Sequence, residues 1–239
     1  MKASRKARRP ASPLNKRAPD ATRAKLLVAA GRMFAERGYH ATTVRDICFR
    51  AGANVALVNY YFGGKQGLYT AVLHQLMARS PHLEEMRGAL DQDAPPEDTL
   101  RAVIKARLHG LCPGVLADEK SRILMHELAQ PTPALTRVIN DISRPLYERM
   151  LALVGGIIGR RPHDEKTRLC VHSVMGQMIV YALARPFLVR LWPELKMTPA
   201  QLDRIAGHIA DFSLAYLGQA GNRKAAAKTG VSTKTGVSK

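Results

Sequence analysis

The sequence predicts an all-α protein with a small N-terminal three-helix domain and a larger helical domain behind it. Three observations support this fold class. Aromatic residues make up only 5% of the 239 residues, and the alternating pattern of β-strands is hard to find. Glycines divide the first 80 residues into short helical segments, whereas longer helical periods begin near residue 95. The chain is long enough to form one or two domains with a good core.

The first helix is expected over residues 21–37, ending at Gly38. Its apolar residues recur at helical spacing and form a stripe for core packing: Leu26, Leu27, Ala30, Met33 and Phe34. Two short helices follow, over residues 43–51 and 55–62. Polar caps and glycine stops mark their ends, in the order Thr43, Gly52, Asn54 and Gly63.

The second short helix has about two turns and is not stable alone. Neighbouring helices must therefore hold it, while its outer face stays free. That arrangement is typical of a helix-turn-helix, whose second helix enters the major groove of DNA. We expect Ala53, Val58 and Phe62 to point inward. The outward set is Val55, Ala56, Leu57, Asn59, Tyr60 and Tyr61. Within it only the Asn59 side chain can pair with a base edge in two places, best with adenine.

Several residues in this region resemble the N-terminal domain of TetR-family transcriptional regulators, over roughly residues 23–77. They are Thr42-Thr43, Asp46-Ile47, Ala51-Gly52 and the run NYYFGGKQGLY at 59–69. The resemblance implies base contacts from Val55, Ala56, Leu57 and Asn59. It implies a base or backbone contact from Tyr60, and phosphate contacts from Thr43, Tyr61 and Lys65. Arg45 matches a base-contacting position, where an arginine can bind guanine bidentately. The reading face is more apolar than in other family members, so DNA shape is expected to carry more of the specificity.

The net charge of +18 is unevenly placed along the chain. Residues 1–19 hold seven Lys and Arg and residues 219–239 hold five, with no acid in either segment. Both segments are expected to be disordered, as a basic arm and a basic tail. The arm either only solubilises the protein or adds phosphate and minor-groove contacts. Residues 20–80 hold eight cations against three acids, whereas residues 81–218 are nearly balanced. The excess in the predicted DNA-binding domain suits a phosphate polyanion.

Residues 81–218 are expected to form the second domain, entered from a helix over residues 65–79. Its longer helices are predicted at 96–112, 115–129, 133–155, 164–190 with a bend at Pro186, and 198–218. Residues 164–185 are apolar almost all round, and residues 198–218 carry an apolar seam. Surplus apolar surface predicts a homodimer through these two helices. Twofold symmetry would place two DNA-binding domains on a near-palindrome.

Part of the second domain resembles the C-terminal domain of the CecR (CerR) subgroup of TetR regulators. The matching residues are Met125-His126-Glu127, Gln130 to Pro133, Pro145-Leu146 and the stretch from His172 to Gln177. The resemblance implies a pocket for a small hydrophobic or amphipathic effector that changes the spacing of the DNA-binding domains. The candidate lining residues are Met125, His126, His172, Met175, Gln177, Met178 and Tyr181. The alternative is that these residues belong to the core and the dimer interface.

No catalytic set, cofactor motif or metal-ligand spacing is found in the sequence. The scattered Cys48, Cys112 and Cys170 indicate reduced thiols, and no apolar run is long enough for a membrane span. We therefore expect a cytoplasmic, non-enzymatic protein that associates with the bacterial nucleoid through DNA binding. The leading hypothesis is a ligand-responsive repressor that binds double-stranded DNA as a homodimer. The alternative is an effector-independent DNA-organising protein that uses its basic tails. An enzyme dependent on His126 or His172 has no support beyond those histidines.

Overall fold

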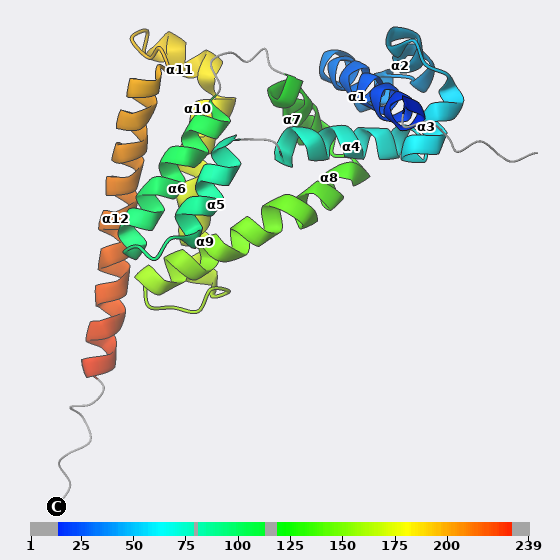
Figure 1. The fold of residues 1–239 in the computed structure, drawn as a ribbon. Coiled ribbons are helices and arrows are strands. Elements are labelled where there is room, and N and C mark those ends of the chain that lie inside the picture. The colour runs from blue at the N-terminus through cyan, green and yellow to red at the C-terminus, as the bar shows by residue number, and fades with distance from the viewer. Residues whose placement is uncertain (1–13, 79–80, 113–118, 231–239) are drawn as a thin grey trace, which may run out of the picture. The chain divides into compact units, whose positions relative to one another are not determined.

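The computed structural model describes residues 14–78, 81–112 and 119–230, and within these ranges it contains helices and no strand (Figure 1). The all-α prediction is confirmed. The helices are α1 (Leu14–Ala41), α2 (Val44–Ala51), α3 (Val55–Phe62), α4 (Lys65–Ala78), α5 (Pro81–Asp91), α6 (Pro96–Leu111), α7 (Glu119–Ala129), α8 (Pro133–Val138), the π-turn η1 (Ile139–Ser143), α9 (Arg144–Ile157), α10 (Glu165–Leu183), α11 (Arg185–Leu191) and α12 (Pro199–Gly230).

The chain divides into two compact units that do not follow the predicted boundary at residue 80. The first, which we call the reader unit, combines the chain up to Gln75 with residues Glu119–Arg137. The second unit contains Leu76–Asp118 and the chain from Val138 onward. Helix α7 and most of α8 therefore belong with α1 to α4, whereas the sequence predicted both in the second domain.

Side chains of α1 and α4 meet in the core of the reader unit. Phe34 of α1 and Tyr69 of α4 are buried, and their rings meet edge to face with centroids 4.7 Å apart. The predicted end of the first helix is confirmed, because Gly38 leaves helical geometry at φ 75° and ψ 173°. The buried Thr42 hydroxyl donates to the Gly38 carbonyl at 2.8 Å, which fixes the turn into α2.

Helix α7 joins the reader unit because it packs along α1. Ile123 is fully buried, and the Glu119 carboxylate pairs with Arg32 at 3.7 Å. The His126 Nε2 atom lies 3.3 Å from the carbonyl oxygen of Ala35. These contacts are spread over two turns of α7. The sequence predicted a helix here but not that α1 would cover it.

Helix α6 is the central helix of the second unit, where it packs against α5, α9, α10 and α12 (Figure 1). Leu100, Ile104 and Leu108 are fully buried on it. On its α12 side, basic side chains meet acids of α12: Arg101 with Asp211 at 2.6 Å, and Lys105 and His109 with Asp203 at 3.1 and 2.9 Å. Apolar packing holds α6 against α12, because exposed pairs of this kind add little stability.

The predicted continuous helix over residues 133–155 is interrupted. A π-turn, η1, separates α8 from α9, and the Arg144 amide donates to the carbonyl of Ile139, five residues earlier. Pro145 follows directly and has no amide hydrogen, so an α-helix could not continue through it without losing a hydrogen bond. The predicted bend at Pro186 is found, since α10 ends at Leu183 and α11 begins at Arg185 with Pro186 in its first turn.

Two helices extend into segments predicted to be disordered. Helix α1 begins at Leu14 instead of Ala21, and α12 continues to Gly230 instead of ending at 218. The α12 extension, residues 219–230, is rich in alanine, lysine and arginine, which favour the prolongation of an existing helix. The rest of the predicted arm and tail, residues 1–13 and 231–239, lies outside the described residues. Helix α5 was not predicted at all.

Across the described ranges, no single helix has the length and apolarity needed to cross a membrane; α10 and α11 pass that test only as a pair, by length and composition alone, and they are bent by 78°.

Candidate DNA-binding surface and effector residues

The ends of α2 and α3 are fixed by side-chain caps at the predicted positions. The Asp46 amide donates to the Thr43 hydroxyl oxygen at 3.2 Å, and the Ala56 amide donates to the Asn54 side-chain oxygen at 2.8 Å. Gly52 closes α2 in the left-handed region at φ 61°. Gly63 closes α3 in the same way at φ 69°. The two side-chain caps and the two glycines thus determine where α2 and α3 begin and end, and so how α3 follows the turn.

One face of α3 is anchored in the reader unit. Val58 is fully buried, whereas Ala53 and Phe62 are half-buried. The Arg23 guanidinium of α1 lies 5.3 Å from the centre of the Phe62 ring. Cys48 of α2 is buried beside this region, and burial raises the pKa of its thiol, so it packs as a small neutral side chain.

The opposite face of α3 carries the predicted base contacts. Tyr60 is 79% exposed and Val55 is 43% exposed, and Ala56 and Asn59 are also exposed. Leu57 and Tyr61 are half-buried, with the Tyr61 ring edge-on to that of Tyr60 at 5.0 Å. The predicted set therefore lies on one short helix, with Tyr60 and Asn59 most available to a partner.

The predicted phosphate contacts flank this helix. Thr43 is exposed at the start of α2, and Arg45 extends from its first turn with an exposed side chain. Lys65, at the start of α4, is half-buried. Its ammonium group donates to the His40 carbonyl at 3.3 Å and lies 4.4 Å from the centre of the Tyr39 ring. Burial lowers the pKa of Lys65, so a nearby anion would favour its charged form.

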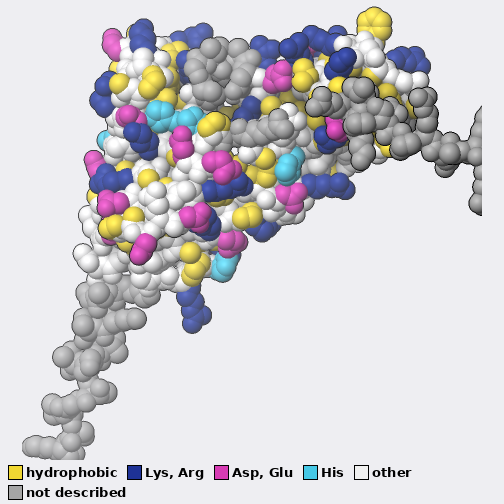
Figure 2. Space-filling view, viewed as in Figure 1, with side chains coloured by type: hydrophobic (Ala, Val, Ile, Leu, Met, Phe, Trp, Pro, Cys, Tyr) yellow, Lys and Arg dark blue, Asp and Glu magenta, His cyan; other side chains and the backbone are white. Residues whose placement is uncertain are grey.

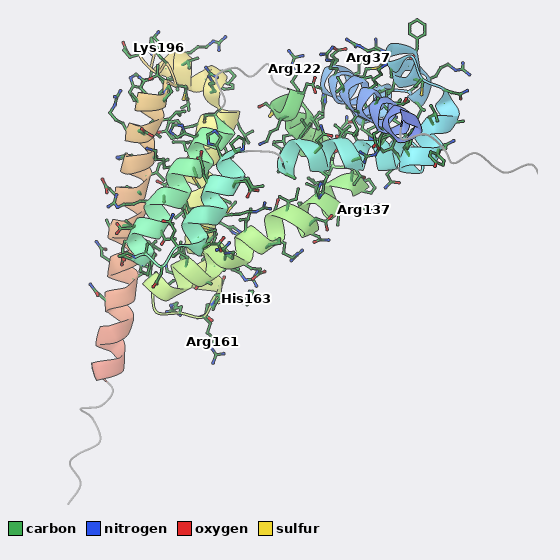
Figure 3. The ribbon with its side chains drawn as sticks, in the orientation of Figure 1. Arg37, Arg122, Arg137, Arg161, His163 and Lys196 are labelled. Carbon is green, nitrogen blue, oxygen red and sulfur yellow. The ribbon has the colours of Figure 1, made fainter. Side chains whose placement is uncertain are left out.

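Three other cations of the reader unit, Arg32, Arg37 and Arg50, form surface ion pairs. Figure 2 shows Lys and Arg side chains, in dark blue, over the part of the unit that α1 and α2 form. Arg37, labelled at the end of α1 in Figure 3, lies 4.0 Å from the Asp46 carboxylate. Arg50 of α2 pairs with Glu36 at 3.1 Å. These exposed pairs contribute little to stability, so a phosphate can compete for the cations.

The seven predicted effector residues are divided between the two units. Met125 and His126 lie on α7 of the reader unit, and the other five lie on α10 of the second unit. His126 packs against the end of α1: a Cβ atom at Gly38 would lie 3.2 Å from its Nδ1 atom. The structure therefore gives His126 a packing role in the reader unit. Met125 is 45% exposed on the same helix.

The five residues on α10 do not converge on one point. His172 faces α9, where its Nε2 atom lies 3.2 Å from the Tyr147 hydroxyl. The Gln177 amide donates to the Ser213 hydroxyl of α12 at 3.2 Å. Met178 is buried in the core, whereas Met175 and Tyr181 are half-buried. Within the described residues no group of three or more potential ligands could hold a metal ion.

Two further residues were not predicted from the sequence to have a functional role. Phe49 is 91% exposed on α2, one turn after Arg45, and enlarges the exposed surface of the reader unit. Arg107 lies on the apolar stripe of α6 in the second unit and is half-buried. The sequence does contain a clue to Arg107. It lies seven residues after Leu100 and three after Ile104, so it shares their helical face, which is buried.

The comparisons with known proteins agree with this architecture. Residues 26–72 match the family of bacterial regulatory proteins described as the tetR family. Residues 96–217 match the C-terminal domain of the HTH-type transcriptional dual regulator CecR. The second match alone covers more than half of the chain.

Individual relatives belong to the same class. The CecR protein of Shigella flexneri is 28% identical over 168 residues, which is 67% of this chain and 75% of the relative. The HTH-type transcriptional repressor Rv3405c of Mycobacterium tuberculosis is 28% identical over 184 residues, or 77% of this chain and 80% of the relative. The crystal structure of the regulator FadR from Bacillus subtilis in complex with stearoyl-CoA has a TM-score of 0.57 at 19% identity, covering 80% of this chain and 97% of FadR. This chain therefore belongs to the TetR family of DNA-binding transcriptional regulators and carries a CecR-type C-terminal domain.

Proposed function

We propose that this regulator is a ligand-responsive repressor that binds a near-palindromic operator as a homodimer. The observation that carries the proposal is the outward face of α3, a two-turn helix held by Val58 with Asn59 and Tyr60 exposed. Asn59 would pair with an adenine and Arg45 with a guanine. Thr43, Tyr61 and Lys65 would hold phosphates, and the apolar Val55, Ala56 and Leu57 would meet thymine methyl groups.

Exposed stripes on α10 and α12 support the homodimer. On α10 the stripe advances by four and three residues and includes small side chains: Leu169, Ser173, Gly176, Val180 and Leu183. On α12, Phe212 is 63% exposed and Tyr216 is 46% exposed. Ser173 and Gly176 leave space in the α10 stripe for large side chains of a partner helix. A second copy would cover both stripes in a four-helix interface with twofold symmetry.

The repressor role and the effector rest on the relatives and on the second unit. Rv3405c is described as a repressor, and FadR was crystallised with stearoyl-CoA, an amphipathic ligand. We infer that an amphipathic effector binds the second unit and prefers the arrangement that fits the operator poorly. A tenfold loss of operator affinity requires about 1.4 kcal/mol of preference between the two arrangements. The protein would act in the bacterial cytoplasm, at the chromosome.

A footprint on the DNA upstream of the protein's own gene distinguishes this proposal from the alternative of tail-driven DNA organisation. We expect protection of one discrete site by the full chain. Deleting residues 1–13 and 231–239 should leave that site protected, because the deletion spares every described helix and the exposed face of α3. The salt dependence of binding should become weaker, since the deletion removes cations that can neutralise phosphates. Protection that is unspecific, or that disappears with the two segments, would favour the alternative.

A further inference from the structure

We propose that Arg107 is the anchor for the anionic group of an amphipathic effector bound in the second unit. The inference rests on the proposed ligand-responsive function and specifies the chemistry of the ligand. Arg107 lies in the second half of α6, the helix that α5, α9, α10 and α12 surround. It shares a stripe with Leu100, Val103 and Ile104, each of which is buried.

Arg107 differs from the other basic side chains of α6 in having no acidic partner among the described residues. Arg101, Lys105 and His109 pair with Asp211 or Asp203 of α12. Over the part of the chain that the structure describes, no carboxylate lies within ion-pair distance of the Arg107 guanidinium. Burial lowers the pKa of Arg107, with no neighbouring charge acting on it. A cation that is partly removed from water without a partner is unfavourable, and proteins rarely keep one for stability.

The guanidinium is nevertheless within reach of a ligand. Every side-chain nitrogen or oxygen that is fully enclosed within the described residues has a hydrogen-bond partner. The Arg107 guanidinium has no hydrogen-bond partner among the described residues. Its nitrogens are therefore not fully enclosed and keep contact with solvent. A carboxylate or phosphate could therefore form two parallel hydrogen bonds with the planar guanidinium. The hydrocarbon body of the ligand follows from the amphipathic effector proposed above, because Leu100, Val103 and Ile104 are buried by the protein's own helices.

Thermal unfolding of the full chain tests the anchor, with Arg101→Met as the matched control on the same helix. Arg101 is exposed and paired, so its replacement should change the ligand-free melting temperature little. Arg107→Met should raise that temperature, because it removes an unpaired cation and keeps the apolar packing. If Arg107 had a purely structural role, its replacement would lower the melting temperature. A fall in melting temperature larger than that of Arg101→Met would overturn the proposal.

The ligand class is tested with decanoate, decyl phosphate and the uncharged decanol. At least one of the two anions should raise the melting temperature of the wild-type protein and of Arg101→Met, and which of them acts separates a carboxylate from a phosphate ligand. Arg107→Met should bind the active anion about 10- to 100-fold more weakly, as expected for a lost hydrogen bond to a charged group. Equal stabilisation by decanol, equal affinity in Arg107→Met, or no effect of either anion would each overturn the proposal.

A DNA-binding assay separates this inference from the proposed function. Without ligand, Arg107→Met should bind operator DNA as the wild type does, because α6 lies in the second unit. The active anion should release the wild type from DNA and should fail to release Arg107→Met. If the anion binds through Arg107 but leaves wild-type DNA binding unchanged, ligand-responsive repression is wrong while the anion site stands.

Discussion

Gly38→Ala should lower the free energy of unfolding of the reader unit by about 3 kcal/mol. The Gly38 backbone, at φ 75° and ψ 173°, lies in a region that is essentially restricted to glycine, and other residues there are strained by about 1–3 kcal/mol. The new Cβ atom would also lie 3.2 Å from the His126 Nδ1 atom, so the His126 ring would have to move away from α1. Chemical denaturation followed by circular dichroism measures the change.

Gly88→Ala provides the control for this substitution. Gly88 is an exposed glycine inside α5, and a Cβ atom there would have no neighbour within 4 Å. Alanine should stabilise the protein by about 0.4–1 kcal/mol at such a site, since it reduces the freedom of the unfolded chain. The explanation for Gly38 is wrong if both substitutions shift the unfolding midpoint in the same direction and by similar amounts.

The second large effect is expected at Glu127, a carboxylate that is 1% exposed in the reader unit. It accepts hydrogen bonds from the Thr132 amide at 3.0 Å and the Thr132 hydroxyl at 2.8 Å. Burial and a hydrogen bond to Glu127 raise the pKa of Tyr69 on α4, so the tyrosine stays neutral and donates. One carboxylate thus links α7, the turn before α8, and the helix that follows the DNA-binding segment.

Glu127→Ala should lower the free energy of unfolding by about 3 kcal/mol, because it leaves several buried donors without an acceptor and each costs about 1–3 kcal/mol. Glu36→Ala in the same unit is the control. Glu36 is exposed and pairs with Arg50 on the surface, and such pairs contribute about 0–1 kcal/mol. Denaturant midpoints measure both. A Glu127→Ala protein as stable as Glu36→Ala would show that the buried network does not support the reader unit.

The DNA-binding segment was predictable because its determinants are local. Thr43 and Asn54 cap helices within three residues, and Gly52 and Gly63 adopt the left-handed conformation that ends them. Such signals require no knowledge of distant contacts. The burial of Val58 followed from the shortness of α3, which requires support from neighbouring helices.

The affiliation of α7 was not predictable in this way. The spacing of Ile123 and Glu127 places both on one helical face, but periodicity does not show which helix covers that face. Glu127 is an acid on an otherwise apolar helical face. A carboxylate buried there needs hydrogen-bond donors from elsewhere in the fold. The same reasoning applies to Arg107. Both residues break the apolar pattern of their helices, and in both cases the environment that explains them is tertiary.

The central claim, that α3 reads DNA twice through a twofold homodimer, is tested most directly by selecting bound sequences from a pool of random duplex DNA. The wild-type chain should enrich a near-palindrome of two half-sites. Asn59→Ala should lose the preference at one position in each half-site, because a two-point contact to a base is worth about 1–3 kcal/mol of discrimination. Enrichment of an unsymmetrical motif, or of the same motif by Asn59→Ala, would contradict the claim.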